Sequence, residues 1–420
     1  MKVPRGLSRS GRRAIECALV LSLLAAASPA APPAPPPPRE TRATELTVLP
    51  FVGGSSDIGF GGGYVAGLVR LVPGYRPYLY RVESAGTVTF DPSRGEGEPA
   101  IPYIDNYVSL TLPHLAGGRI RLDLRLAYTR EAALKYYGIG NASVVPSGRD
   151  PSESYFEHAR DHPTLAAQAE HRSGPVLLRW GVSYTQNWIE IREGTKLAED
   201  MQRGDPKVRA LLGPDGAHGV PEFWFGVGWD SRDDETAPRQ GAYHTLRVDL
   251  SPGALGAPAY RYGRIDFAAR GYHPLVPGRF TLAARFVTDA LFGNPPFYEL
   301  ARFDDSAALG GPKGVRGIPA QRYYGMLKLF GNLELRSQLF DFAVFSKPYR
   351  FGLVLFADAG RVVADYGKNP ELDGTGLGLK YGFGVGPRLA SGRAFVVRLD
   401  VAWSPDAHPL SAYLLAGHAF

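Results

Sequence analysis

The sequence has one cysteine and no long apolar run. The first absence argues against a disulfide-rich protein, and the second against a protein that spans a membrane with helices. Cys17 lies close to the N-terminus, so the rest of the chain offers no thiol for a disulfide framework or a thiolate metal site. No later segment supplies the roughly 20 consecutive apolar residues of a transmembrane helix. Glycine, by contrast, occurs 51 times and aromatic residues make up 11% of the chain, which is typical of short strands, tight turns and interfacial aromatic belts.

Residues 1–31 have the features of a signal peptide: a basic start, an apolar stretch too short to span a bilayer, and small residues for cleavage at 28–30. The basic side chains are Lys2, Arg5, Arg9, Arg12 and Arg13. With Glu16 they account for +4 of the formal charge of +6, so the remainder carries only about +2 and gives little support for nucleic-acid binding. Residues 32–44 are a proline-rich linker.

From residue 45 to residue 420 short alternating segments follow one another with no change in composition. They predict sixteen strands, and an even number is what a bacterial outer-membrane barrel requires. The predicted strands start near residues 46, 58, 78, 101, 118, 154, 175, 219, 240, 259, 278, 324, 350, 375, 393 and 410.

Many of these segments carry aliphatic side chains on one face and charged side chains on the other, most clearly 118–131, 324–339 and 393–403. A soluble sandwich alternates too, but a membrane barrel turns its charges into the lumen and its aliphatic side chains to lipid. The export signal, the length of the strands and the terminal aromatic residue favour the barrel. Segment 410–420 would be the closing strand, with Phe420 on its apolar face as the barrel-closure signal.

Nothing in the sequence names a catalytic, cofactor-binding or metal-binding residue. The nine histidines are scattered, there is no Gly-x-Ser-x-Gly elbow, and the glycines at 59–63 are not followed by a phosphate-binding helix. Loop 194–218 is predicted to be an exposed extracellular loop. Aromatic residues near strand ends are predicted to form an interfacial girdle: Tyr78, Tyr80, Tyr103, Tyr107, Trp180, Trp188, Trp224, Trp229 and Trp403.

One loop has a more specific pattern. Residues 310–317 read Gly-Gly-Pro-Lys-Gly-Val-Arg-Gly, which places Arg316 among glycines in a compact turn. By alternation Glu334 and Asp358, on the following strands, both face the lumen. A loop folded inward could therefore bring the Arg316 guanidinium onto two carboxylates through bidentate hydrogen bonds.

With Val315, Arg316 and Gly317 in this order before the terminal Phe420, the chain resembles the BamA/TamA-type bacterial surface antigen family. The resemblance covers about residues 45–420 and includes 136–141 and 228–241. It implies that the sixth extracellular loop enters the barrel and that Arg316 and Gly317 form a loop lock with Glu334 and Asp358. Two positions depart from the family pattern, Ile318 and His418. The stretch between the signal and the first strand is also too short for the periplasmic polypeptide-transport-associated (POTRA) domains of that family.

The resemblance implies a Gram-negative outer-membrane protein without a cofactor. Its role would be insertion or translocation of polypeptides, through a seam that opens between the first strand, near 46–53, and the last. Its partners would be outer-membrane lipid and either client β-barrel proteins or a separate periplasmic protein, with no nucleic acid. Without POTRA domains, the alternative is a passive pore or structural barrel.

Overall fold

A computed structural model describes residues 43–420 apart from 76, 92–99, 152, 214–215, 255–258, 303–308, 345–346, 392–394 and 407–409. The predicted signal peptide and nearly all of the predicted linker lie outside the described residues. No helix in the described part of the chain is both long and apolar enough to cross a bilayer.

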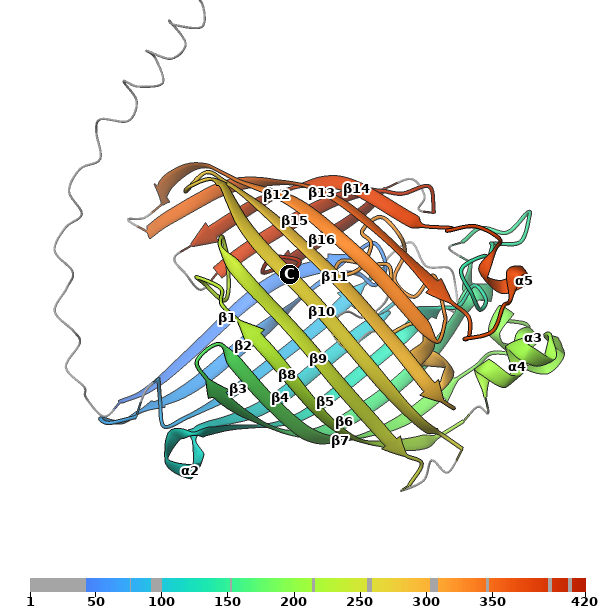
Figure 1. Cartoon of the computed structure of the whole chain (residues 1–420), viewed down its shortest axis with the longest axis horizontal. Coiled ribbons are helices and arrows are strands. Elements are labelled where there is room, and N and C mark those ends of the chain that lie inside the picture. The colour runs from blue at the N-terminus through green and yellow to red at the C-terminus, as the bar shows by residue number, and fades with distance from the viewer. Residues whose placement is uncertain are drawn as a thin grey trace, which may run out of the picture. The chain divides into compact units, whose positions relative to one another are not determined.

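Sixteen antiparallel strands form a closed barrel, in which each strand pairs with its neighbours in the chain and β1 pairs with β16 (Figure 1). The first eight are β1 Ala43–Ser55, β2 Gly59–Leu71, β3 Tyr80–Phe90, β4 Tyr103–His114, β5 Ile120–Lys135, β6 Glu157–Ser173, β7 Val176–Glu190 and β8 His218–Asp230. The others are β9 Gly241–Pro252, β10 Arg261–Val276, β11 Phe280–Gly293, β12 Leu327–Val344, β13 Lys347–Val363, β14 Lys380–Ser391, β15 Phe395–Trp403 and β16 Ser411–Ala416.

The predicted fold and strand number are confirmed, and most strands begin within three residues of the predicted position. The largest error is at β14, which was expected near residue 375 and begins at Lys380. Short helix α5, Pro370–Asp373, precedes it, and the carbonyls of Gly376 and Leu377 accept hydrogen bonds from Arg361. Those carbonyls therefore bond a side chain, and the strand starts after them.

The strands bury their charged side chains and expose their aliphatic ones, as a barrel in lipid requires. On the inner face of β12, Lys328, Glu334 and Arg336 are all buried, whereas Leu333 on the outer face is exposed. The same arrangement recurs on β15, where Asp400 is fully buried and Val401 is exposed. The alternation in the sequence therefore corresponds to charged side chains in the lumen and aliphatic side chains on the outer wall.

The two ends of the barrel differ (Figure 1). At one end, here called the turn end, most connections are short and the four-residue helical turn α2, Leu115–Gly118, joins β4 to β5. At the other, here called the cap end, lie α3, Lys196–Arg203, α4, Pro206–Leu212, and α5. Two 3-10 turns, η1 Ser154–Phe156 and η2 Phe297–Leu300, belong to connections at the cap end.

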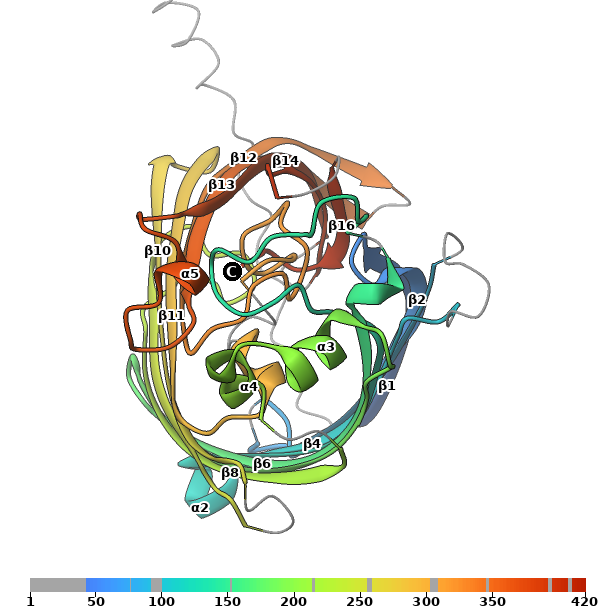
Figure 2. The ribbon, with the colours of Figure 1, turned by 90° about the vertical axis from the view of Figure 1, so that its right-hand side faces the viewer.

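Loop 194–218 was predicted to be exposed, and its described residues are exposed only in part. Viewed along the barrel, α3 and α4 lie across its opening (Figure 2). Leu197 and Leu212 are fully buried and pack with Tyr136, Phe297 and other side chains of the cap-end connections. In the sequence, the apolar residues of this loop are interspersed with charged ones, but in the structure they form a narrow apolar stripe. Burial of that stripe holds the loop over the lumen.

The aromatic residues assigned to a girdle divide between the two faces. Trp180, Trp188, Trp229 and Trp403 are exposed, in agreement with a lipid-interface position. Trp224 instead lies under the guanidinium of Arg247, 4.2 Å from its ring centroid. Tyr107 donates to Glu83 and lies under Arg125. These two rings belong to the polar face of their strands.

The closing strand is shorter than predicted, because it ends at Ala416 and not at Phe420. Gly417 adopts a φ of 83°, which favours glycine and turns the chain out of the strand. The carbonyl oxygen of Phe420 accepts a hydrogen bond from Arg336 Nη2 at 2.8 Å. Its ring lies under Arg336 and Arg285, at 5.0 and 4.9 Å from the centroid. Phe420 therefore contacts lumen charges and does not continue the apolar face of β16.

We predict that Leu126→Arg destabilises the barrel in lipid by about 2–4 kcal/mol, since Leu126 is exposed near the middle of β5 and a charge there would face hydrocarbon. Leu377→Arg is the matched control, because Leu377 is exposed in a loop at the cap end. Urea unfolding in phospholipid vesicles measures both. Equal stabilities for the two variants would contradict a lipid-facing wall at Leu126.

Candidate functional site

The connection between β11 and β12 folds into the lumen, where Figure 2 shows it inside the ring of strands. Residues 309–324 of this connection are here called the plug loop. Leu309, Val315, Ile318 and Tyr323 of this loop have no exposed surface. They pack against side chains of the barrel wall, among them Phe330 and Val362. Ile318, which departs from the family pattern, fills a place in this apolar cluster.

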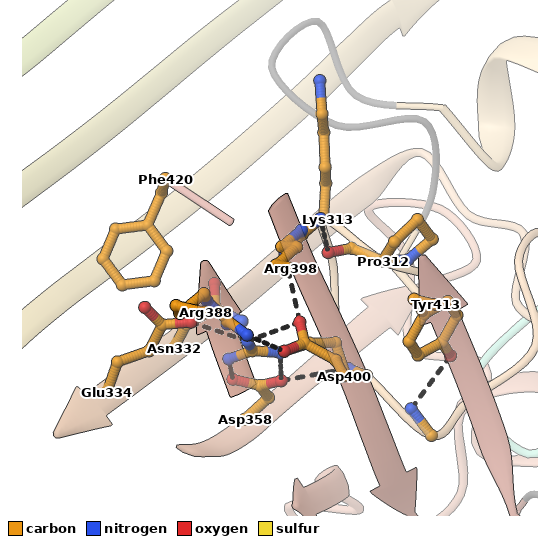
Figure 3. A network of polar contacts seen from close by, with 12 residues as sticks. Pro312, Lys313, Asn332, Glu334, Asp358, Arg388, Arg398, Asp400, Tyr413 and Phe420 are labelled. Carbon is orange, nitrogen blue, oxygen red and sulfur yellow. Dashed lines mark hydrogen bonds and ion pairs between the residues drawn. The ribbon is translucent and has the colours of Figure 1, made fainter. Parts of the chain in front are cut away.

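Arg316 is the centre of the polar contacts that the loop makes with the wall. Its Nε and Nη2 donate to Asp358 Oδ2 and Oδ1 at 2.8 and 2.9 Å, which is a bidentate pair. Its Nη1 donates to Glu334 Oε1 at 2.6 Å and to Asp400 Oδ2 at 3.4 Å. These four residues are here called the Arg316 cluster, and Figure 3 shows its three carboxylates converging from three strands.

The Arg316 cluster is buried, so its charges depend on one another. Arg316 has 0% of its side chain exposed, and its guanidinium also lies 3.6 Å from the ring centroid of Phe356. Burial by itself would lower the pKa of Arg316, but the carboxylates of Asp358 and Glu334 outweigh it and raise the pKa above the ordinary value. The guanidinium is therefore permanently charged, and no proton can leave to relieve the cluster if a carboxylate is removed.

Further hydrogen bonds hold the backbone of the loop. Gly317, at a φ of 94° that favours glycine, donates its N–H to Tyr413 Oη at 3.1 Å. Asn332 Nδ2 donates to the carbonyl of Gly314 at 2.8 Å, and Arg398 Nη2 donates to that of Pro312 at 2.9 Å. Tyr413 belongs to β16, so the plug loop is fastened to the last strand of the barrel as well as to β12, β13 and β15 (Figure 3).

The structure thus places Arg316 against both carboxylates that the sequence predicted, and it places Gly317 beside the last strand. Asp400 and Tyr413 were not predicted. Asp400 belongs to segment 393–403, whose alternation predicts one charged face, so the pattern gave its side of the wall but not its partner. For Tyr413 the sequence gave no signal beyond alternation. The function of these contacts as a lock stays a prediction.

The other two resembling segments fix loops. In 136–141, the N–H of Gly140 donates to the carbonyl of Tyr324 at 2.8 Å, and Asn141 donates to the carbonyl of Gly378 at 2.8 Å. Segment 228–241 contains the turn between β8 and β9, where Asp233 Oδ1 accepts from the N–H groups of Arg239 and Gln240. The first segment joins the plug loop to the cap, and the second closes a turn at the turn end.

The seam between β1 and β16 has little pairing. Only Gly54 with Leu414 and Ser55 with Tyr413 are in register, and the N–H of Ser56 donates to the carbonyl of Ala412 at 3.1 Å. All thirteen residues of β1 pair with β2. Among the described residues, 43–53 of β1 therefore have no strand partner on the other side. A six-residue closing strand beside a thirteen-residue first strand leaves a free edge.

A large cavity, of about 2040 Å³, opens above the plug loop at the cap end. Its wall is mixed, and its polar side chains include Asp57, Tyr103, Glu131, Arg302, Arg322 and Lys380. Asp57 lies in the turn between β1 and β2 and accepts a hydrogen bond from the N–H of Ala320 in the plug loop. Burial raises the pKa of Asp57 to about 7, because its Oδ2 is enclosed and accepts no hydrogen bond from the described residues.

We predict that Arg316→Ala lowers the free energy of unfolding by about 3–5 kcal/mol, because three buried carboxylates lose their shared cation. Arg316→Lys should recover less than half of this, since an ammonium cannot form the bidentate pair with Asp358. Urea unfolding, with hydrogen exchange of residues 309–320 measured by mass spectrometry, tests both variants. Arg149→Lys, in an exposed ion pair, is the control. Wild-type exchange in Arg316→Lys would contradict the lock.

The stability of the barrel should also depend on pH through Asp57. Because the folded pKa of Asp57 lies near 7 and its usual value is 3.8, the folded state retains a proton that the unfolded state loses between about pH 4 and 7. The contribution of Asp57 to stability should therefore fall as pH rises through this range. Asp57→Asn should unfold at a higher temperature relative to wild type at pH 8 than at pH 5. An equal difference at both pH values would show that Asp57 ionises normally.

The family was identified by comparison with known proteins. Residues 109–409 match the model of the Omp85 superfamily domain, and a search of the curated proteins gave no match. Among solved structures, the chain is similar to BamA from Haemophilus ducreyi lacking POTRA domains 1–3, with a TM-score of 0.57 and 14% identity. It is also similar to CdiB from Escherichia coli, with a TM-score of 0.55 and 13% identity.

The similarity covers 90% of this chain and 70% of the BamA chain, and 89% of this chain and 62% of the CdiB chain. At these identities the two structures support the fold alone. The domain match extends over more than half of the sequence and includes Arg316, Glu334, Asp358 and Asp400. On this match and the sixteen-stranded barrel, the chain belongs to the Omp85 superfamily.

Proposed function

We propose that this protein is a Gram-negative outer-membrane barrel that assists the insertion or translocation of other polypeptides, with the β1–β16 seam as its working part. The observation that carries the proposal is the seam itself, in which two residue pairs join the first and last strands. A strand edge with unpaired N–H and C=O groups can pair with an incoming strand by β-augmentation. Membership of the Omp85 superfamily supports the same role.

The position of the plug loop supports coupling between the lumen and the seam. Gly317 donates to Tyr413 on β16, and Ser411 Oγ donates to the carbonyl of Gly317 at 3.5 Å. At the other side of the seam, the turn after β1 places Asp57 against the N–H of Ala320. Both edges of the seam thus contact one loop. In this proposal the loop holds the two edges in register while no client strand is bound.

The partners in this proposal are outer-membrane lipid and a client β-barrel protein, or a separate periplasmic protein that delivers the client. The described residues carry no docking domain of their own beyond the barrel. No covalent chemistry is needed, because strand pairing supplies the interaction. Arg316 and the carboxylates of Glu334, Asp358 and Asp400 are one another's partners in the Arg316 cluster, so we assign these four residues no catalytic role.

A passive pore is the second candidate, and the cavity of about 2040 Å³ favours it. The plug loop and the α3–α4 cap oppose free passage, because both lie across the lumen (Figure 2). Conductance in a planar bilayer separates the two candidates. A pore would conduct steadily as purified, whereas an insertion factor with the plug loop in place would conduct little.

We predict that a disulfide across the seam abolishes insertion activity. Ser56→Cys with Ala412→Cys places two thiols at hydrogen-bonded backbone positions, one directly after β1 and the other on β16. The oxidised protein should fail to speed the insertion of another barrel into vesicles, and reduction should restore the rate. Full activity of the oxidised protein would contradict seam opening.

The matched control for this experiment is Val108→Cys with Leu126→Cys. These residues are cross-strand partners on β4 and β5, in a wall that remains paired throughout. Oxidation of this pair should leave the rate unchanged. If both disulfides stop insertion, the effect comes from rigidity of the whole barrel and not from the seam.

A further inference from the structure

A second cavity, of about 470 Å³, lies in the lumen at the turn end, on the opposite side of the Arg316 cluster from the large cavity. Its lining includes Arg336 on β12, Arg388 on β14 and His418 in the C-terminal turn. The floor and sides include small apolar side chains, among them Ala390 and Val396. Its volume is within the range of small-ligand sites.

Arg388 leaves one edge of its guanidinium, with three of the five N–H donors, without a partner among the described residues. Its Nη1 forms an ion pair with Asp400 Oδ1 at 2.6 Å and donates to the carbonyl of Pro387 at 3.1 Å. Its Nε and Nη2, which form the other edge of the guanidinium, are buried and donate to no group among the described residues. That edge is the one that binds an oxyanion through two parallel hydrogen bonds. Buried donors without a partner cost free energy, so a ligand that accepts from them binds with an advantage.

Two further nitrogen atoms without partners in the described structure belong to residues of the same cavity, and the Nδ1–H tautomer makes the histidine one a donor. Arg336 uses Nε for Glu334 and Nη2 for the carbonyl of Phe420, which leaves Nη1. His418 Nδ1 is also buried and unpartnered. Arg336 on β12, Arg388 on β14 and His418 in the C-terminal turn therefore all line one cavity, and each carries a nitrogen without a partner. A planar carboxylate has two oxygens and suits the Arg388 edge alone, whereas a tetrahedral phosphate has oxygens for all three residues.

The acidic residues of the cavity do not compete for these donors. Asp233 and Asp234 lie in the turn between β8 and β9 and line the cavity. The Oδ1 atom of Asp233 accepts from the N–H groups of Arg239 and Gln240, and that of Asp234 accepts from those of Thr236 and Ala237. Their negative charge is thus directed at backbone donors of their own turn, while the arginines keep the cavity positive.

We propose that the turn-end cavity is a binding site for a phosphate group, held by the free edge of Arg388 with Arg336 Nη1 and His418 Nδ1. Burial lowers the pKa of His418, so at neutral pH the imidazole contributes a hydrogen bond and the arginines contribute the charge. The site does not depend on the proposed insertion function. The phosphate could be free or part of a lipid headgroup, and the two sources are separated by experiment.

The test uses the full barrel in detergent and inorganic phosphate as the probe. Phosphate should raise the unfolding temperature in a saturable manner and broaden the ³¹P signal of free phosphate, whereas sodium chloride at matched ionic strength should do neither. Dihexanoyl phosphatidic acid is the second arm. Saturation by phosphate indicates a site for the free ion, and saturation by phosphatidic acid alone indicates a headgroup site. Saturation by neither, or tighter binding of acetate than of phosphate, overturns the proposal.

Two charge-preserving variants locate the site. Arg388→Lys keeps a cation beside Asp400 but removes the two-donor edge, so phosphate affinity should fall about tenfold or more. Arg350→Lys is the matched control, because Arg350 lines the same cavity but already uses its Nε and Nη2 on Asp341. Its affinity should equal that of wild type. Wild-type affinity in Arg388→Lys, or an equal loss in both variants, contradicts the assignment.

A third variant keeps the proposal testable if Arg388→Lys does not fold. Ala390→Glu adds a carboxylate to the cavity wall without removing an existing contact. The new side chain should take the arginine donors and abolish the phosphate-dependent shift while raising the unfolding temperature in buffer alone. Retention of the phosphate-dependent shift in this variant would place the binding elsewhere.

Discussion

The buried guanidinium of Arg316 is the interaction on which the interior of this barrel depends. It brings together carboxylates from β12, β13 and β15, none of which could remain charged in the lumen without a cation. In return, those carboxylates bind the guanidinium of a loop whose apolar side chains also pack against the barrel wall. Removing either side leaves an unpaired buried charge, so the loop and the wall are stable only together.

This dependence links parts of the molecule that are distant in the chain. Arg316 and Asp400 are separated by 84 residues, as are Arg336 and Phe420. Asp400 also binds Arg388 and Arg398, and Glu334 also binds Arg336. On one side, the Arg316 cluster is therefore connected through Arg336 to the C-terminal residue Phe420. Through Gly317 and Tyr413 it continues to the seam (Figure 3).

The sequence predicts the strands of the barrel wall well, but it predicts the contacts made inside the lumen poorly. The reason is physical. Strands such as β12 and β15 show their two faces in every second residue, because each side chain meets either lipid or lumen. Arg316 with Glu334 and Asp358 was predictable from a family motif. Asp400, Tyr413 and the turn at Gly417 were not, because each depends on which distant strand lies opposite. The buried stripe of α3 and α4, which includes Leu197 and Leu212, was hidden among charged neighbours for the same reason.

The end of the chain has a practical consequence. The final residue is folded inward, with its carbonyl on Arg336 and its ring beneath two guanidinium groups. Any residues fused behind it would begin inside the lumen, among charges that already have partners, and would have to leave past the turn-end cavity. An affinity tag or fluorescent reporter for this protein is therefore better inserted in an exposed cap-end loop, such as the one that contains Val144, than appended to the carboxyl terminus.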